Sequence, residues 1–174
     1  MATADEKLFL WINGLAGEFS PLDNAMEWVV SDYLVPVALA LSLVAFWFLG
    51  RDKEARKRNQ IGMFVALTSM GLSSLSVLII NAAYFRPRPF DVEGLDVTLL
   101  FYRPTDSSFP ANPIAASVGI AAAVWAINRR LGGAMLVAVG LYGFARVYAG
   151  VHYPLDIVAG ALIGAVMTFV VFKL

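Results

Sequence analysis

Long stretches without a charged residue constrain this chain most. Residues 33–50, 59–85 and 107–128 contain no Asp, Glu, Lys or Arg, and shorter uncharged stretches cover residues 131–145 and 157–172. A helix that crosses a bilayer needs about 20 mostly apolar residues. The sequence therefore predicts an all-α bundle with about five transmembrane helices, the last two extended by adjoining residues. A buried helix of a soluble protein is the alternative for any one stretch, but five such stretches in 174 residues leave little amphipathic surface.

The composition agrees with a membrane protein and excludes several kinds of chemistry. Hydrophobic residues make up 59% of the chain and charged residues 15%, whereas soluble domains average roughly 25% charged residues. The absence of cysteine excludes disulfides, thiol catalysis and thiolate metal sites, and the single histidine excludes a cluster of histidine metal ligands. A formal net charge of zero gives no global attraction to nucleic acid.

The first 32 residues differ from the rest of the chain. They mix acidic residues with aromatic residues such as Trp11 and Trp28 at loosely helical spacing. Such a segment is typical of amphipathic helices that lie in the membrane interface. Its acidic start is unlike that of a cleavable signal peptide, which begins basic. We expect one or two interfacial helices here.

No linker, low-complexity tract or internal repeat divides the chain. We therefore expect a single domain over residues 1–174, made of the interfacial segment 1–32 and a transmembrane bundle over 33–174. Gly160 and Gly164 are spaced to allow close helix packing. We expect this packing within the bundle rather than in a dimer.

The distribution of basic residues predicts the orientation in the membrane. If residues 1–32 lie outside, the loop 51–60, Arg129, Arg130 and Lys173 lie inside, which places eight of the 13 basic residues on the cytoplasmic side. This asymmetry follows the positive-inside rule. It predicts an integral membrane protein whose first 32 residues lie outside.

The outer side then keeps arginines that need an explanation. Arg86 and Arg88 follow the second apolar stretch, and Arg146 precedes the only histidine, His152. With alternating topology these segments and the stretch 107–117 meet at the outer face. Guanidinium groups bind phosphate oxygens in pairs, so the arrangement indicates an anion pocket. Arginines that merely extend to the interface are the alternative.

His152 and Asp156 suggest their own chemistry. Pro154 is suited to the first turn of the last apolar helix, which places Asp156 about one turn after His152. A carboxylate there can accept the Nδ1 proton of the imidazole and leave Nε2 free to attack. An ordinary hydrogen-bonded histidine at the interface is the alternative.

Three short motifs resemble those of the type 2 phosphatidic acid phosphatase superfamily. The segment ARVYAGVHYPLD (145–156) resembles its third signature, S-R-x5-H-x3-D, and NAAYFRPRP (81–89) resembles its first, K-x6-R-P. The segment FPANP (109–113) lies where the second signature, F-P-S-G-H, is expected. Other segments, such as GVHYPLDIVAG, are most similar to the small bacterial undecaprenyl-diphosphate phosphatases linked to bacitracin resistance. This resemblance implies a bacterial-type inner or plasma membrane, with the site facing outside.

The resemblance implies a role for each matching residue. His152 would be the nucleophile that forms a phosphohistidine, and Asp156 would orient it. Arg88 and Arg146 would bind phosphoryl oxygens, with Arg86 as a weaker candidate. The resemblance implies neither a metal nor another cofactor, since arginines would stabilise the developing charge.

The chain departs from the signatures at five positions. Asn81 stands where the first signature has Lys, and Ala145 replaces the Ser of the third. In the second signature Ala111 replaces Ser, Asn112 replaces Gly, and Pro113 replaces the general-acid His. Loss of general acid catalysis typically costs about 10²–10⁴-fold in rate. A diphosphate suffers less than a monoester, because its leaving group is a weakly basic phosphate rather than an alkoxide.

Two functions therefore remain open at this stage. The first is a lipid phosphate or diphosphate phosphohydrolase at the outer membrane face, with polyprenyl diphosphate as the expected substrate. The second is a catalytically impaired pseudophosphatase that binds lipid or acts as a subunit with membrane-protein partners. A transporter is a third reading, which draws only on intramembrane arginines.

Overall fold

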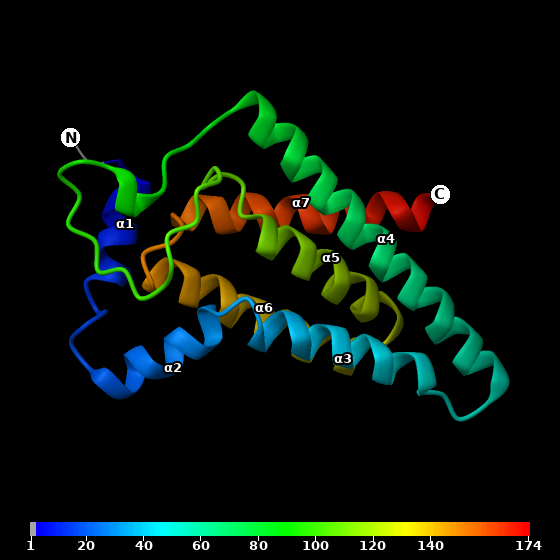
Figure 1. Ribbon diagram of the computed structural model, residues 1–174. Coiled ribbons are helices and arrows are strands. Elements are labelled where there is room, and N and C mark those ends of the chain that lie inside the picture. Colours follow the sequence, from blue (N-terminus) through cyan, green and yellow to red (C-terminus); the bar gives the residue numbers. More distant parts are fainter. Residues whose placement is uncertain (1–2) are drawn as a thin grey trace.

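The computed structural model describes residues 3–174, and the regular structure of this part of the chain is entirely helical. Seven α-helices and one 3-10 turn follow one another (Figure 1): α1 (Ala4–Asn13), α2 (Ser20–Val30), α3 (Leu34–Phe48), α4 (Lys53–Ala83), η1 (Pro89–Asp91), α5 (Asn112–Ile127), α6 (Arg129–Tyr148) and α7 (Pro154–Lys173). The N-terminal segment contains two helices, α1 and α2, within the expected range.

Each of the five uncharged stretches lies on its own helix, α3 to α7. Three helices are long and apolar enough to cross a membrane: α4, α6 and α7. Helices α2 and α3, which are bent by 50° relative to each other, are together also long and apolar enough to form one span. Helix α5 is apolar but shorter. The predicted all-helical membrane bundle is confirmed.

Two segments expected to be loops are mostly helical instead. Helix α4 begins at Lys53, because the Asp52 carboxylate accepts a hydrogen bond from the Ala55 N–H at 2.7 Å and the Lys, Glu and Arg residues that follow are good helix formers. Helix α6 begins directly at Arg129, where the Asn128 side chain accepts from the Leu131 N–H at 3.1 Å. The prediction that these basic residues lie in loops is therefore wrong for most of them.

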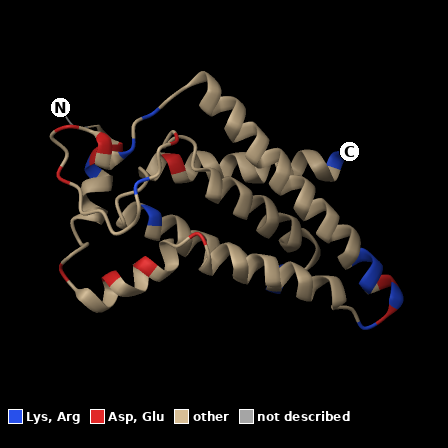
Figure 2. Cartoon of the chain, viewed as in Figure 1, with Lys and Arg blue, Asp and Glu red and all other residues tan. Residues whose placement is uncertain are grey.

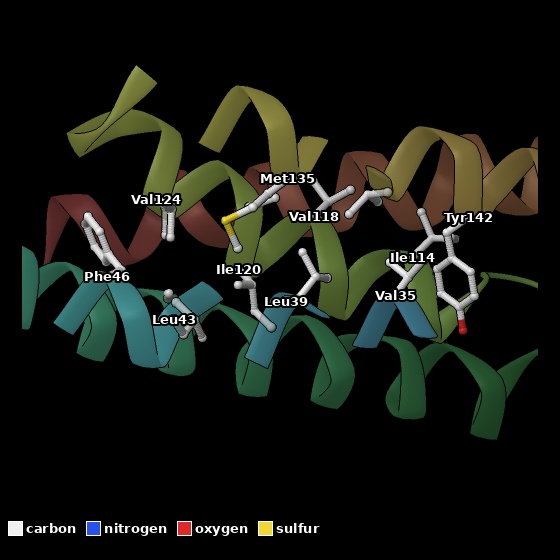
Figure 3. Packing of buried hydrophobic residues seen from close by; sticks show 14 of the residues in the cluster. Val35, Leu39, Leu43, Phe46, Ile114, Val118, Ile120, Val124, Met135 and Tyr142 are labelled. Carbon is white, nitrogen blue, oxygen red and sulfur yellow. The ribbon is translucent and has the colours of Figure 1, made fainter. Parts of the chain in front are cut away.

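Helix α5 lies at the centre of the bundle, between α4, α6 and α7 (Figure 1). Figure 3 shows Leu39 and Leu43 of α3 facing the α5 side chains. Val118 and Ile120 of α5 and Met135 of α6 belong to the same buried cluster. By contrast, much of the apolar surface of α4 and α7 is exposed, as expected of helices that face lipid. Helix α5 is thus the most enclosed of the apolar helices.

Small residues let α7 approach α5. A Cβ atom on Gly164 would lie 2.5 Å from the Ala115 carbonyl oxygen, and one on Gly160 would lie 2.5 Å from that of Ala111. Both obstacles are backbone atoms and cannot rotate away. The expectation that these glycines pack within the bundle is confirmed.

The two ends of the bundle differ in their charges. Basic residues gather at the start of α4 (Figure 2). The opposite end carries α1 and the connections before α5 and between α6 and α7, where acidic and basic side chains alternate (Figures 1 and 2). The second end therefore brings the predicted site segments together.

We expect Gly164→Ala to destabilise the protein by roughly 1–3 kcal/mol, because a methyl group at this position overpacks the α5–α7 contact. Gly140→Ala is the matched control, since nothing lies within 4 Å of a Cβ at this helical position. The control should leave stability unchanged or raise it slightly, by helix propensity. Thermal unfolding in a neutral detergent measures both, and equal melting temperatures for the two variants would contradict the close α5–α7 contact.

Candidate active site

The predicted site segments meet at one end of the bundle. The chain after α4 supplies Arg86 and Arg88, the segment before α5 supplies Ser108, and the connection between α6 and α7 supplies His152. Arg88, Ser108 and His152 are all buried. The site is therefore made of segments far apart in the sequence.

The turn that carries His152 is held by backbone contacts. Gly150 has a positive φ of 81°, and a Cβ there would lie 2.8 Å from Val97 Cγ1 and 2.9 Å from the Thr98 oxygen. The carbonyl of Arg146 accepts from the N–H groups of Val151 at 2.9 Å and His152 at 3.3 Å. Glycine is thus required for the turn that presents the imidazole.

Both ring nitrogens of His152 have a fixed role. Nδ1 lies 2.9 Å from the carbonyl oxygen of Ser108, and Nε2 lies 3.2 Å from Nη1 of Arg88. A carbonyl only accepts and a guanidinium only donates. The contacts therefore assign the proton to Nδ1 and a lone pair to Nε2.

Asp156 acts on this ring through Ser108 rather than directly. Its Oδ2 atom is 3.7 Å from Nδ1 of His152, beyond a hydrogen bond. The fully buried carboxylate accepts instead from the Ser108 hydroxyl, from the Tyr153 N–H at 2.9 Å and from Nη1 of Arg86 at 2.6 Å. The expectation that Asp156 accepts the Nδ1 proton itself is corrected, because the Ser108 carbonyl takes that place.

Arg88 is buried and contacts the histidine from the Nε2 side. Besides His152, its Nη1 donates to the Val151 carbonyl at 3.1 Å. Its Nε and Nη2 donate to the Asp106 backbone oxygen at 3.0 Å and the Asp106 carboxylate at 2.8 Å. The side chain of Asp106 is itself 64% exposed. A carboxylate from the surface thus covers this guanidinium.

Arg146 shows a similar arrangement. Its Nη2 lies 3.3 Å from the carboxylate of Asp32, and its Nη1 donates to the Tyr142 hydroxyl at 3.0 Å. Asp32 is also partly exposed. The Nε of Arg146 is buried and, within residues 3–174, has no hydrogen-bond partner. A buried donor without a partner is costly, so this atom favours an acceptor from a ligand.

Arg86 lies in a different environment. Its Nη1 pairs with Asp156 at 2.6 Å, its Nη2 pairs with Asp5 of α1 at 2.7 Å, and its guanidinium stacks 4.0 Å from the centre of the Tyr153 ring. Both terminal nitrogens are therefore bound to carboxylates of the protein. In this arrangement Arg86 joins α1 to α7, and its place among the phosphate ligands stays a prediction.

The five positions that depart from the signatures line the same region. Asn81 lies in the last turn of α4 and Pro113 in the first turn of α5, as its sequence position predicts. Ala111 and Ala145 are fully buried. The side-chain oxygens of Asn81 and Asn112 are buried and unpaired within the described chain. None of these side chains supplies a titratable group.

Four residues that complete the site could not be predicted from sequence motifs. Ser108 precedes the second motif at a position that its pattern leaves unspecified. Asp5, Asp32 and Asp106 lie in surface segments without a motif, and only the fold places them against Arg86, Arg146 and Arg88. The acidic start of the chain, noted for its unlikeness to a signal peptide, was the one available signal for Asp5.

Burial lowers the pKa of His152 from its ordinary value of 6.5 to about 4, and the nearby charges of Arg146 and Arg88 act in the same direction. The carboxylate of Asp156 opposes them. The imidazole is therefore neutral at physiological pH. Its Nε2 lone pair lies beside guanidinium groups, an arrangement able to attack a phosphoryl group held by those cations.

Known proteins share both the sequence and the fold. Residues 62–174 match the PAP2 superfamily. The chain is 30% identical over 168 residues to undecaprenyl-diphosphatase BcrC of Bacillus subtilis (strain 168), which covers 96% of this chain and 82% of the relative. It is 29% identical over 164 residues to the bacitracin transport permease protein BcrC of Bacillus licheniformis, with 94% and 77% covered.

Two solved structures have the same arrangement of helices. The crystal structure of Aquifex aeolicus LpxE superimposes with a TM-score of 0.71 at 27% identity, covering 99% of this chain and 97% of the other. The first transmembrane PAP2 type phosphatidylglycerolphosphate phosphatase from Bacillus subtilis gives a TM-score of 0.66 at 18% identity, with 98% and 83% covered. At that identity the second likeness concerns the fold alone.

We expect the His152 imidazole to titrate with a midpoint near 4 and in the Nδ1–H tautomer. Since the folded pKa lies below the unfolded one, the unfolded chain binds the extra proton, and the stability from this group is lost as the pH falls from 6.5 towards 4. Labelled-histidine NMR of untagged protein measures this directly, because the chain has one histidine. A midpoint near 6.5 in the folded protein would contradict the buried, neutral ring.

Proposed function

Because the chain belongs to the PAP2 superfamily, we propose that it is a lipid phosphate or diphosphate phosphohydrolase whose preferred substrate is a polyprenyl diphosphate. One observation carries the proposal. The Nε2 atom of His152 has an unprotonated lone pair, 3.2 Å from Nη1 of Arg88, at the end of a membrane bundle. This is the arrangement that a phosphohistidine mechanism needs.

The arginines support the phosphate part of the proposal. Arg88 and Arg146 would bind the phosphoryl oxygens, and the unpartnered Nε of Arg146 would donate to one of them. Asp106 and Asp32, which pair with these arginines, are both exposed to an extent that allows their displacement. A phosphate would then take the place of the two carboxylates.

The proposed reaction has two steps. The Nε2 lone pair attacks the terminal phosphorus, a P–N bond forms, and the bond from phosphorus to the leaving oxygen breaks with its electron pair staying on that oxygen. Water then attacks the phosphohistidine and releases inorganic phosphate with a free imidazole. During both steps the Nδ1–H bond to the Ser108 carbonyl orients the ring, and the Asp156 contact to the Ser108 hydroxyl fixes that segment.

The choice of a diphosphate follows from the missing proton donor. Pro113 has neither a titratable side chain nor an N–H group, so an alkoxide leaving group would depart without help. A lipid diphosphate expels a lipid monophosphate, which is far less basic (second pKa roughly 6). One of the related proteins supports this choice, since it is an undecaprenyl-diphosphatase.

A hollow beside the site suits a substrate with a lipid tail. A space of about 690 Å³ lies between α1, the end of α4 and the start of α7, lined by Tyr84, Phe109 and Leu155 as well as by Asp5 and Arg86. Helix α1 contributes Asp5 to the lining of this hollow. We therefore also propose that residues 1–174 act as one domain.

A second candidate function is a pseudophosphatase that binds lipid, alone or with a partner membrane protein. The unpaired buried oxygens of Asn81 and Asn112 favour it, because these positions carry Lys and Gly in the family signatures and have not gained new partners within residues 3–174. The two proposals differ in turnover.

Phosphate release from a polyprenyl diphosphate by the purified protein tests the proposed function. We expect release from the diphosphate to exceed release from a lipid monophosphate, and His152→Ala to abolish both. No release from any lipid phosphate would favour the pseudophosphatase. Fast hydrolysis of monoesters would show that another group donates the proton, which contradicts the assigned site.

Rebuilding the second signature tests the role of the missing acid. The combined substitution Ala111→Ser, Asn112→Gly and Pro113→His should raise monoester hydrolysis more than diphosphate hydrolysis, by roughly 10²–10⁴-fold. The same substitution combined with His152→Ala is the control and should stay inactive. If the rebuilt signature leaves an inactive parent inactive, Asn81 and Ala145 become the next candidates for the defect.

We also propose that the site faces outside, because the basic start of α4 lies at the opposite end of the bundle. The chain has no cysteine, so the single variants Arg56→Cys and Asp96→Cys can be labelled cleanly in intact cells. An impermeant thiol reagent should label Asp96→Cys from outside, whereas Arg56→Cys should react only after the membrane is opened. The reverse pattern would place the site on the inner leaflet.

A further inference from the structure

A second basic site lies at the end of the bundle opposite His152. Four arginines border a hollow of about 740 Å³ there: Arg51, Arg58, Arg129 and Arg130. They come from two separate places, the start of α4 with its preceding turn and the start of α6. The lining of this hollow contains no acidic residue.

Within residues 3–174 these four arginines form no ion pair. The ion pairs formed within residues 3–174 involve other residues, at the end of the bundle that carries the candidate active site. Asp52 and Glu54 border Arg58 in a neighbouring hollow, but neither forms an ion pair with it, and Asp52 is the cap of α4. Like charges that converge without a counter-ion repel one another. An anion in the hollow would relieve this repulsion.

The hollow is built on ordered elements rather than on loose side chains. The buried Asn59 side chain donates to the Leu49 carbonyl at 2.7 Å and ties the end of α3 to α4. Arg129 stacks 3.8 Å from the ring centre of Trp125, which fixes its guanidinium at the edge of the hollow. The first turns of α4 and α6 both border the hollow, and helix N-termini favour negative charge.

The rest of the lining is apolar and comes from the ends of transmembrane helices. Phe48 and Leu49 of the α3 end and Ile127 of the α5 end border the arginines. A ligand at this position would contact guanidinium groups with one part and hydrocarbon with another. This combination suits a phospholipid better than a free ion.

We propose that this hollow, defined by Arg51, Arg58, Arg129 and Arg130, binds the phosphate headgroup of an anionic phospholipid of the adjacent leaflet. The site is independent of the chemistry at His152, and the lipid bound there is a structural ligand rather than a substrate. Basic pockets between transmembrane helices recognise such headgroups by charge. Bound lipid would stabilise the junction between α3, α4 and α6.

The experiment is a lipid titration of the purified full chain in neutral detergent, followed by thermal unfolding. Phosphatidylglycerol should raise the melting temperature, whereas phosphatidylcholine should not. Arg129→Gln with Arg130→Gln should weaken the phosphatidylglycerol effect on the order of tenfold in concentration. Lys53→Gln with Arg56→Gln is the matched control, since these residues lie on the same face of the membrane but outside the lining. The control should respond like the parent.

Two further arms identify the ligand and exclude the other site. Inorganic phosphate and glycerol phosphate should give little effect, and an effect as large as that of the lipid would assign the hollow to a free phosphate instead. The titration is repeated in Arg88→Gln, where the lipid effect should persist. Loss of the effect in Arg88→Gln, or an equal loss in the control variant, would overturn the proposal. Unfolding without lipid checks that each variant is folded.

Discussion

The buried carboxylate of Asp156 is the interaction on which this end of the molecule depends. An ionised group without solvent contact is costly unless hydrogen bonds and an opposite charge compensate it. Asp156 obtains these from three segments: the Ser108 hydroxyl before α5, Arg86 after α4 and the Tyr153 N–H at the start of its own helix. Arg86 also pairs with Asp5, which links α1 to the same cluster. One side chain thus aligns the segments that carry the candidate catalytic groups.

Much of the fold could be predicted because a bilayer simplifies the pattern. A run of uncharged residues needs no period to be recognised as a membrane helix, and all five runs lie on helices. The prediction failed at the ends of helices, where Lys53 and Arg129 turn out to be helical. A capping side chain such as that of Asp52 or Asn128 determines where each helix begins. The cap acts through a single hydrogen bond to a backbone N–H group, which a hydropathy pattern does not detect.

The part of the site that could be predicted is the part formed by residues close together in the sequence. His152 and Asp156 lie within one local turn, and the Pro113 position follows from its place in a helix start. The spacing could not tell that the Ser108 carbonyl, rather than Asp156, contacts the imidazole, since a difference of less than 1 Å decides it. Nor could it separate the tasks of Arg86 and Arg88, which are two residues apart but face different carboxylates. Such partners are chosen by tertiary packing.

Two arginines of the candidate site are already paired with carboxylates of the protein. Arg88 pairs with Asp106 and Arg146 pairs with Asp32, so their positive charges are balanced. If Arg88 and Arg146 bind phosphate as proposed, the phosphate group replaces two carboxylates of the protein rather than entering an unpaired positive cavity. The affinity for an anion would then be a difference between two charge-balanced states, one with the carboxylates on the arginines and one with the anion in their place.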